Sequence, residues 1–301
     1  MCSVKQASEL ALKGRGVEEW LDLHFFRPAG IRVARALYPT RITPDQVTLV
    51  CLLLGLAAGH LMVYRSTLLT GLGVAVFIVS DIFDSADGQL ARLRGTSTRF
   101  GRILDGVSDN LRFLNLYLHL LVRLILDGWS GGAIALIVTA GISHALQSAG
   151  ADFMRHAFLE AGEGEGGELD LPDAAATAPT GGFWRRVAIR AYRDYVERQA
   201  RMFSASVALI RRLRVEGVSN GFRAGYRAAQ QRQVTWCALI AQNVRFVLLA
   251  FTVVPGHPAA YLWVTVGPLN LVLLWLWWVH ERNARQLLLG LEDLRPMAVV
   301  A

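Results

Sequence analysis

Apolar residues along this chain gather into long runs, and short polar clusters separate them. A helix needs about 20 mostly apolar residues to cross a bilayer. We predict six membrane-crossing helices, at about residues 45–64, 68–83, 100–126, 132–158, 234–254 and 259–279. Short turns at 65–67, 127–130 and 255–258 join them in pairs. The pattern therefore predicts an all-α integral membrane protein with six transmembrane helices.

Composition supports this class and excludes several others. Of the 301 residues, 53% are hydrophobic and 18% are charged, whereas an ordinary soluble domain has about 25% charged residues. The three cysteines, Cys2, Cys51 and Cys237, show no disulfide or zinc-site spacing. A secreted globule, a disordered tail and a disulfide-rich mini-protein are therefore excluded.

The N-terminal segment contains no continuous apolar run, so we expect no cleavable signal peptide. Residues 28–38 instead predict an amphipathic helix, with Ile31 and Ala34 on one side and Arg32 and Arg35 on the other. This pattern is typical of an interfacial helix that lies in the headgroup region. A helix packed on the rest of the protein is the alternative.

The basic residues predict how the chain is oriented in its membrane. The net charge is +7, and arginines gather in the segments after the second, fourth and sixth predicted helices. Cytoplasmic loops carry the excess of basic residues, and an even number of crossings puts both ends of the chain on one side. We therefore predict a multi-pass protein of the cell (inner) membrane with both termini in the cytoplasm. The basic excess then serves orientation and contact with anionic lipid, and we expect no nucleic-acid partner.

The crossings divide the chain into five predicted segments. These are a cytoplasmic N-terminal segment with the interfacial helix (1–43), helices one to four (44–158), a cytoplasmic insertion (159–232), helices five and six (233–280) and a cytoplasmic tail (281–301). The insertion begins as a Gly-, Ala- and acid-rich flexible linker and becomes Arg-rich and helical from about residue 183. Three interpretations of its helices stay open: contact with anionic lipid, a cover over an active site, or solvated helices with no chemical role.

Five aspartates lie around the end of the second predicted helix and the start of the third: Asp81, Asp84, Asp87, Asp105 and Asp109. Ionisable side chains in membrane segments are costly and indicate function. Spacings of three and four residues place each set on one helical face, where unscreened like charges repel one another. Divalent cations remove that conflict, and oxygen-only ligands favour Mg²⁺ or Mn²⁺ over zinc. Helix capping or pairing with nearby arginines accounts for one or two of these acids.

Small residues follow on the same run. Gly88 and Ala91 make one helical face small, so that a phosphorylated ligand can approach the backbone. Arg92 adds a fixed cation that can contact phosphate oxygens through two N–H groups. Metal-binding acids, small residues and an arginine together predict a site for a ligand that carries a pyrophosphate.

This run resembles the signature of the CDP-alcohol phosphotransferase (CDP-alcohol phosphatidyltransferase) family. It matches at every fixed position: Asp84, Asp87, Gly88, Ala91, Arg92, Gly101, Asp105 and Asp109. The resemblance extends to the six-helix plan, to the interfacial helix and to residues 43–48, where Asp45 stands in place of the family's usual Asn.

The resemblance implies an integral membrane enzyme, usually a homodimer. Such an enzyme moves a substituted phosphoryl group from a CDP-alcohol to an acceptor hydroxyl and releases CMP. By similarity, two divalent ions (Mg²⁺ or Mn²⁺) are held by Asp84, Asp87 and Asp105, and Asp109 contributes to the metal site and acts as the general base. The resemblance also assigns the CDP site, to Asp84, Gly88, Ala91, Arg92 and Gly101.

Polar residues on the fourth predicted helix indicate where an acceptor binds. A polar face there contains His144, Gln147, Ser148, Asp152 and Arg155, and two further cations at membrane depth are Arg112 and Arg245. Such a pocket suits a phosphorylated or carboxylated acceptor. The alternative is that these residues satisfy one another inside the bundle, for example Asp152 with Arg245 or Arg155.

The leading hypothesis is a phospholipid synthase that uses CDP-diacylglycerol and a small polar alcohol, with the identity of the alcohol left open. A second hypothesis within the family is a soluble CDP-alcohol donor with a lipid or polyol-phosphate acceptor. Two hypotheses of other classes are an Asp-rich intramembrane prenyltransferase, whose acids lie on distant helices, and a non-enzymatic cation carrier, whose acids lie at midplane depth. Release of CMP from a CDP-alcohol distinguishes these classes.

Overall fold

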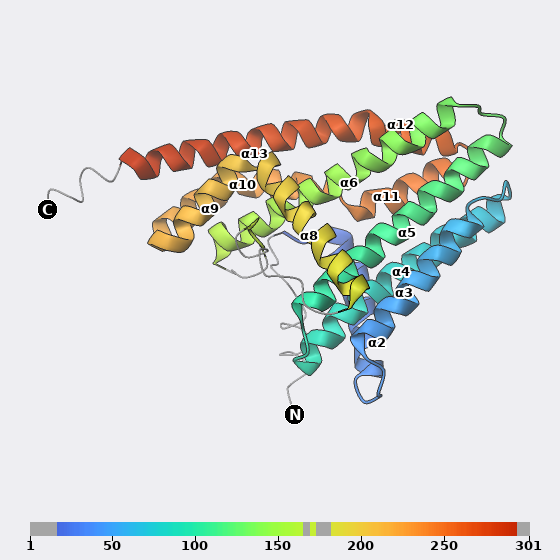
Figure 1. The fold of residues 1–301 in the computed structure, drawn as a ribbon, viewed down its shortest axis with the longest axis horizontal. Coiled ribbons are helices and arrows are strands. Elements are labelled where there is room, and N and C mark those ends of the chain that lie inside the picture. Colours follow the sequence, from blue (N-terminus) through green and yellow to red (C-terminus); the bar gives the residue numbers. More distant parts are fainter. Residues whose placement is uncertain (1–16, 165–168, 173–181, 294–301) are drawn as a thin grey trace, which may run out of the picture. The chain divides into compact units, whose positions relative to one another are not determined.

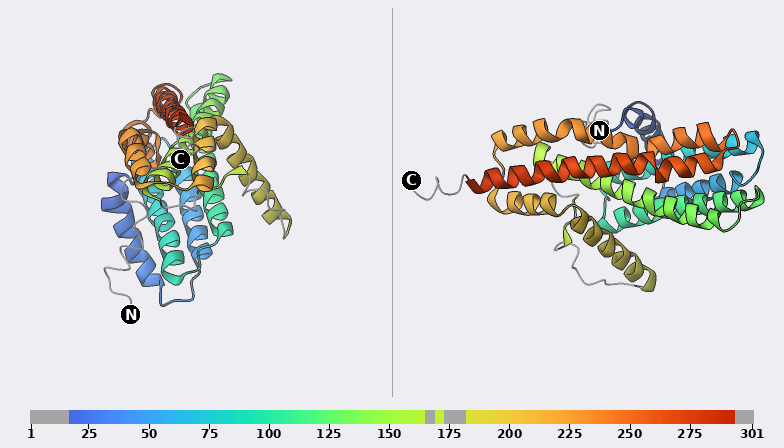
Figure 2. Two further views of the ribbon diagram at one scale, coloured as in Figure 1. Left: turned by 90° about the vertical axis from the view of Figure 1, so that its left-hand side faces the viewer. Right: turned by 90° about the horizontal axis from the view of Figure 1, so that it is seen from above.

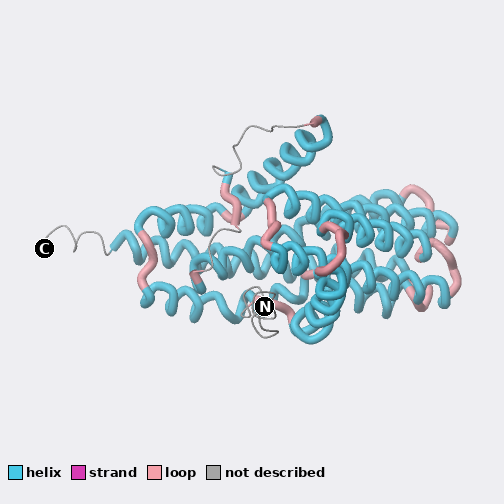
Figure 3. The backbone as a smooth tube through the Cα atoms, turned by 90° about the horizontal axis from the view of Figure 1, so that it is seen from below, coloured by secondary structure: helices cyan, strands magenta, loops and turns pink. Residues whose placement is uncertain are grey.

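The computed structural model describes residues 17–164, 169–172 and 182–293, and every regular element in these ranges is a helix (Figure 1, Figure 3). The predicted all-α class is therefore confirmed for the described chain. The chain forms two compact units. Unit 1 contains Met1–His144 and Gln242–Pro268, and unit 2 contains Ala145–Ala241 and Leu269–Ala301.

Long helices build both units. Unit 1 contains η1 (Asp22–Phe26), α2 (Arg27–Leu37), α3 (Pro44–Leu61), α4 (Thr67–Arg94), α5 (Arg99–Leu126), α11 (Gln242–Leu248), η4 (Leu249–Val253) and α12 (Pro258–Val266). α6 (Gly132–Phe158) begins in unit 1 and ends in unit 2. Unit 2 adds η2 (Leu159–Glu163), α8 (Phe183–Met202), α9 (Ser204–Glu216), α10 (Asn220–Trp236) and η3 (Cys237–Ile240). α13 (Pro268–Asp293) belongs to unit 2 from Leu269 onward.

Within the described residues, five helical stretches are long and apolar enough to cross a membrane: Pro44–Leu61, Thr67–Arg94, Gly132–Glu163, Asn220–Val253 and Pro258–Leu291. The chain is therefore a multi-pass membrane protein. α5 is 28 residues long but is not among them, because acids, arginines and a histidine interrupt its apolar sequence. Six crossings remain a prediction, and so do the orientation of the termini, the type of membrane and the five segment boundaries.

The last two predicted helices are each interrupted. The stretch predicted as 234–254 contains the end of α10, then η3, then Ala241 in an extended conformation, and then α11 and η4. Gln242 and Asn243 follow this break as the first two residues of α11, and their side-chain amides donate to acids. The stretch predicted as 259–279 is divided at Gly267, because Pro268 has no N–H group to continue α12.

Capping and turn residues decide where the helices around the acidic run begin and end. Thr43 and Gln46 cap α3 reciprocally, with the Gln46 N–H donating to Thr43 Oγ1 at 3.3 Å and the Thr43 N–H donating to Gln46 Oε1 at 2.9 Å. Thr98 Oγ1 caps α5 by accepting a backbone N–H at 2.9 Å. α4 ends at Arg94, and the next residue, Gly95, has a φ of 65° in the left-handed region that favours glycine. Only a short turn therefore separates the acidic end of α4 from the acidic start of α5.

Aromatic side chains fill the middle of unit 1. The ring centroid of Phe77 on α4 lies 5.2 Å from that of Phe113 on α5 and 5.5 Å from that of Phe246 on α11. Leu116 and Leu249 are fully buried against this cluster. Because lipid removes most of the hydrophobic driving force between helices, their association depends on such close contact.

α2, which matches the predicted amphipathic helix, lies against α4. Ala34 is fully buried in this contact, and Arg32 and Arg35 are exposed. Arg94 holds the end of α2 by donating to the carbonyls of Leu37 at 2.8 Å and of three residues that follow it. The structure thus shows the contact with protein that was the alternative interpretation, and the interfacial location stays a prediction.

In unit 2, α13 fixes the sharp bend between α8 and α9. Trp277 Nε1 donates to the carbonyl of Met202, the last residue of α8, at 2.6 Å. One turn later, Glu281 accepts the N–H groups of Ala205 at 2.9 Å and Ser206 at 3.0 Å, at the start of α9. Two side chains of one helix therefore satisfy backbone groups at the end of one insertion helix and the beginning of the next.

Arginines of the insertion have two kinds of surroundings. Arg214 of α9 pairs with Glu160 through N···O distances of 2.5 and 2.8 Å, and this hydrogen bonding raises the pKa of Arg214 above its usual value. Arg186 and Arg190 of α8 are instead exposed, and α8 leans away from the other helices of unit 2 (Figure 2). The three interpretations of the insertion stay open.

Candidate functional site

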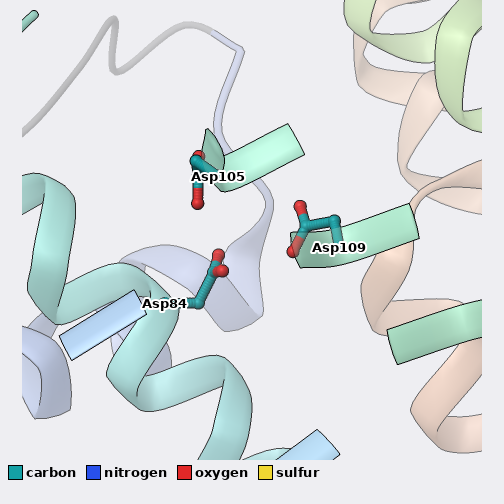
Figure 4. Close-up of side chains that lie close together, drawn as sticks. All are labelled: Asp84, Asp105 and Asp109. Carbon is teal, nitrogen blue, oxygen red and sulfur yellow. The ribbon is translucent and has the colours of Figure 1, made fainter. Parts of the chain in front are cut away.

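Three aspartates of the predicted run meet in unit 1. Asp84 comes from α4, and Asp105 and Asp109 come from successive turns of α5. One carboxylate oxygen from each lies within 4.8 Å of the others, and the three side chains point toward one another (Figure 4). All three are half-buried, so the group can be reached from solvent. This arrangement gathers three negative charges in a small space.

Asp87 lies one turn further along α4 and has a different partner. It is 5% exposed and accepts a hydrogen bond of 2.5 Å from Thr48 Oγ1 of α3. It is not a member of the group that converges within 4.8 Å. Thr48 had no role in the sequence prediction, although it belongs to the polar start of α3.

Arg112 of α5 binds the acidic group from inside the bundle. Its Nη2 donates to Asp84 Oδ1 at 3.0 Å and also to Asp109 Oδ1. The sequence analysis predicted Arg112 as part of an acceptor pocket, and that role stays a prediction; its contacts with the aspartates were not predicted. The spacing of three residues from Asp109 is the signal that sequence reasoning missed.

Asp81, the fifth aspartate, lies on the far side of Arg112. Its Oδ1 is 3.5 Å from Arg112 Nη1 and accepts a hydrogen bond from Gln242 of α11. The next residue, Asn243, donates to Glu19 at 2.8 Å and Asp22 at 3.0 Å. The two amides after the break at Ala241 therefore tie α11 to acids of α4 and of the N-terminal segment. Two adjacent amides inside an apolar run were the available signal for this contact.

The small residues lie beside the acids on the same helices. Gly88, Ala91 and Arg92 are half-buried on α4. A Cβ on Gly88 would lie 3.4 Å from Arg92 Nη1, which is ordinary van der Waals contact with the guanidinium. Gly101 contributes its N–H to the cap of α5. Their assignment to a CDP site stays a prediction.

The residues predicted for an acceptor pocket fall in both units. In unit 1, His144 lies 3.2 Å from the hydroxyl of Tyr117, and fully buried Arg245 donates to Thr265 Oγ1 at 3.2 Å. The other members, on the part of α6 that belongs to unit 2, are Ser148, Asp152 and Arg155. Each of the two sets is placed within its own unit, and the pocket as a whole stays a prediction.

The donor set of the aspartate group fits hard divalent ions. Its ligand atoms are carboxylate oxygens, without sulfur or imidazole nitrogen, as Mg²⁺ and Mn²⁺ prefer. Asp87 supplies a further carboxylate on the next turn of α4. Among the residues that the structure describes, no other group of three or more acids, histidines or cysteines converges in this way.

Comparison with known proteins finds a family that part of this chain resembles. The family model of CDP-alcohol phosphatidyltransferase matches residues 41–161, which contain the whole aspartate group. This region of the chain is therefore similar to the CDP-alcohol phosphatidyltransferases.

Several curated proteins are similar to part of this chain. A phosphatidylinositol phosphate synthase of Corynebacterium glutamicum is 37% identical over 101 residues, which are 30% of this chain and 42% of that protein. The Mycobacterium marinum phosphatidylinositol phosphate synthase is 37% identical over 79 residues, which are 26% of this chain and 33% of the relative. An archaetidylinositol phosphate synthase of Pyrococcus horikoshii is 32% identical over 80 residues, which are 27% of this chain and 41% of that protein. The matched region thus spans less than half the length of these relatives.

Proposed function

We propose that this protein is a membrane phosphotransferase of phospholipid biosynthesis, which moves a substituted phosphoryl group from a CDP-alcohol to an acceptor hydroxyl. The observation that carries the proposal is the convergence of Asp84, Asp105 and Asp109 within 4.8 Å, inside the region that matches the family. The proposed donor is CDP-diacylglycerol. The names of the relatives make a phosphorylated inositol the first acceptor to test.

The proposed reaction exchanges one phosphorus–oxygen bond for another. The acceptor hydroxyl attacks the phosphorus that carries the alcohol group of the donor. A bond forms between this phosphorus and the acceptor oxygen, and the bond to the bridging oxygen of the diphosphate breaks. CMP leaves with that oxygen, and the acceptor proton passes to a base of the protein.

Each motif residue has a role in this proposal. Divalent ions would be held by the motif aspartates and would supply charge stabilisation at the diphosphate and the acceptor oxygen. The ligands that we assign are Asp84, Asp87, Asp105 and Asp109. Gly88 and Ala91 on α4, together with Gly101 on α5, leave room for the diphosphate of the donor. Arg92 contacts the oxygens of that diphosphate.

We assign the general base to Asp109. Its side chain is 34% exposed, compared with 24% for Asp84, so it is the more accessible of the two acids that Arg112 binds. A carboxylate surrounded by cations is a weak base. The acid with the smallest share in holding ions is therefore the one suited to accept a proton, and we expect that acid to be Asp109.

CMP release from the purified full-length chain tests the proposal directly. The donors are CDP-diacylglycerol and soluble CDP-alcohols, each with Mg²⁺ or Mn²⁺, and the acceptors are inositol phosphate, inositol, glycerol phosphate, serine and diacylglycerol. We expect CMP only when a donor, an acceptor and a divalent ion are all present, and loss of CMP on chelation.

Two other outcomes would overturn the proposal. Transfer of a prenyl group from a prenyl diphosphate, without CMP release from any donor, indicates the prenyltransferase class. Ion flux into liposomes, without CMP release, indicates a cation carrier.

The assembly and orientation are part of the same proposal. We propose a homodimer in the inner membrane with both termini in the cytoplasm. Light scattering of the purified protein measures the oligomeric state, and labelling of single cysteines added at each terminus in intact cells measures the orientation.

A further inference from the structure

The buried arginine of the aspartate site has no part in the reaction proposed above. Arg112 has an exposed side-chain fraction of 0%, although it carries a full charge. Burying a charge is costly unless opposite charges and hydrogen bonds surround it. The partners that surround it come from α4 and α5: Ser80, Asp81, Asp84 and Asp109. The arginine is thus an integral part of the acidic group.

The two ends of this guanidinium have different surroundings. Nη2 donates to Asp84 and Asp109, two of the three acids that converge. Nη1 donates to Ser80 Oγ at 3.0 Å and lies 3.5 Å from Asp81 Oδ1. Ser80 and Asp81 do not belong to the converging group. They anchor one end of the arginine, while the other end faces the acids.

We propose that Arg112 is the resident counter-cation of the aspartate site, which aligns Asp84 and Asp109 before divalent ions bind and limits the affinity of the site for those ions. A positive charge in contact with two ligand carboxylates opposes a further cation at the same place. Asp81, which lies outside the converging group, balances part of the arginine's charge. Arg112 acts through the carboxylates, so it is a positioning residue. The inference rests on the proposed function for the identity of the ions and of the donor.

A consequence follows for the order of binding. Mg²⁺ is commonly held by one or two carboxylates together with substrate phosphates. With Arg112 in place, the aspartates alone bind ions weakly, and the diphosphate of the donor supplies the missing negative charge. Ions and donor therefore bind cooperatively in the native protein, and removal of the arginine charge weakens this cooperativity.

Gly55 of α3 provides the room for Arg112. A Cβ at this position would lie 2.5 Å from both Cγ and Cδ of the arginine. Because the backbone of α3 lies so close, a side chain at residue 55 would occupy the space of the aliphatic stem of Arg112. Gly55→Ala therefore displaces the guanidinium without changing any charged residue.

Arg123 supplies a matched control on the same helix. It is 2% exposed, and its Nη1 donates to the carbonyl of Met62 at 3.2 Å and to Thr70 Oγ1 at 3.3 Å. Both partners are neutral oxygens, in contrast to the acids around Arg112. Arg123→Gln thus removes a buried arginine without removing a cation from the aspartate group.

Binding of Mn²⁺ to the purified full-length protein tests the inference without turnover. Electron paramagnetic resonance measures free Mn²⁺ and gives the dissociation constant with and without CDP. We expect Arg112→Gln to bind Mn²⁺ about tenfold more tightly in the absence of CDP, and CDP to tighten its binding less than in the native protein. Arg112→Lys keeps the charge, so its constant stays within about twofold of the native value.

The control and the second variant complete the test. Arg123→Gln leaves the Mn²⁺ constant unchanged, and Gly55→Ala tightens Mn²⁺ binding in the same direction as Arg112→Gln. Unchanged or weaker binding in folded Arg112→Gln overturns the inference. If Arg112→Gln does not fold, Gly55→Ala decides by the same criterion. A native protein that binds Mn²⁺ and releases CMP, with no tightening in the variants, refutes the inference alone; a native protein that does neither refutes the proposed function.

Discussion

Two acidic sites of this protein, one buried and one half-buried, show how surroundings decide what a carboxylate does. In unit 2, Glu281 is 3% exposed and accepts two backbone N–H groups and the hydroxyl of Ser206, at 2.8 to 3.0 Å. In unit 1, Asp84, Asp105 and Asp109 face one another within 4.8 Å. The first site gives one acid several neutral donors. In the second site, several acids face one another, and two of them contact a single guanidinium.

The difference separates a structural acid from a binding acid. Backbone N–H groups at the start of α9 lack partners within their own helix. Glu281 accepts hydrogen bonds from them, so the donors and the buried carboxylate satisfy each other. Acids that face acids repel one another unless a cation joins them. Arg112 contacts two of the three aspartates, so the group still carries an excess of negative charge that suits a divalent ion, and four substitutions test this contrast.

The largest effect is expected from loss of an acid that faces other acids. Asp84→Asn removes the charge of one proposed metal ligand from the group. We expect CMP release to fall by about a thousandfold or more, and Mn²⁺ binding, measured by electron paramagnetic resonance, to be lost as well. Near-native turnover in this variant would contradict the assignment of the site. Glu281→Gln is the control, and we expect it to keep Mn²⁺ binding.

Asp109 separates the two duties that we assign to the acidic group. Asp109→Asn keeps an oxygen that can accept from Arg112, so the surroundings of the site persist. We expect the variant to bind CDP and Mn²⁺ but to lose turnover, by about a hundredfold to ten-thousandfold, because it cannot accept a proton. Calorimetry with CDP and a CMP-release assay measure the two parts. Intact turnover removes Asp109 from the role of base.

The sequence predicted the aspartate group better than it predicted the surroundings of Glu281. The spacing of the aspartates along α4 and α5 is local, so periodicity alone brings Asp105 and Asp109 to one face, and the bounds of α6 agree with the predicted 132–158. The start of α3 at Pro44 also agrees to within one residue with the predicted crossing at 45–64.

Contacts between distant segments were not predictable in this way. Glu281 meets Ser206 across 75 residues, and Gln242 meets Asp81 across 161 residues. No periodicity within one helix records such a pairing. Arg112 was recognised as a buried cation, but its partners depend on how α4 and α5 face each other. The break at Ala241 was missed because the residues around it are apolar enough to read as one helix.

Glu281 itself should affect stability more than chemistry. Glu281→Gln keeps one carbonyl oxygen but turns the other oxygen into a donor that faces N–H groups at the start of α9. We expect the free energy of unfolding to fall by about 1–3 kcal/mol, with faster hydrogen exchange in α8 and α9 and nearly native CMP release per folded molecule. Loss of turnover without loss of stability would instead give this acid a place in the reaction.

The smallest effect belongs to an acid that faces water. Glu197 of α8 pairs with Arg193 at 2.9 Å, and the two side chains are 35% and 54% exposed. An exposed pair at this helical spacing contributes about 0.3–0.5 kcal/mol, because water competes for both charges and salt screens them. We expect Glu197→Gln to shift the melting temperature by less than Glu281→Gln does, and added salt to reduce the difference from the native protein. A shift as large as that of Glu281→Gln would mean that burial and backbone donors do not set the contribution of an acid in unit 2. The contrast between Glu281 and the aspartate group would then need another cause.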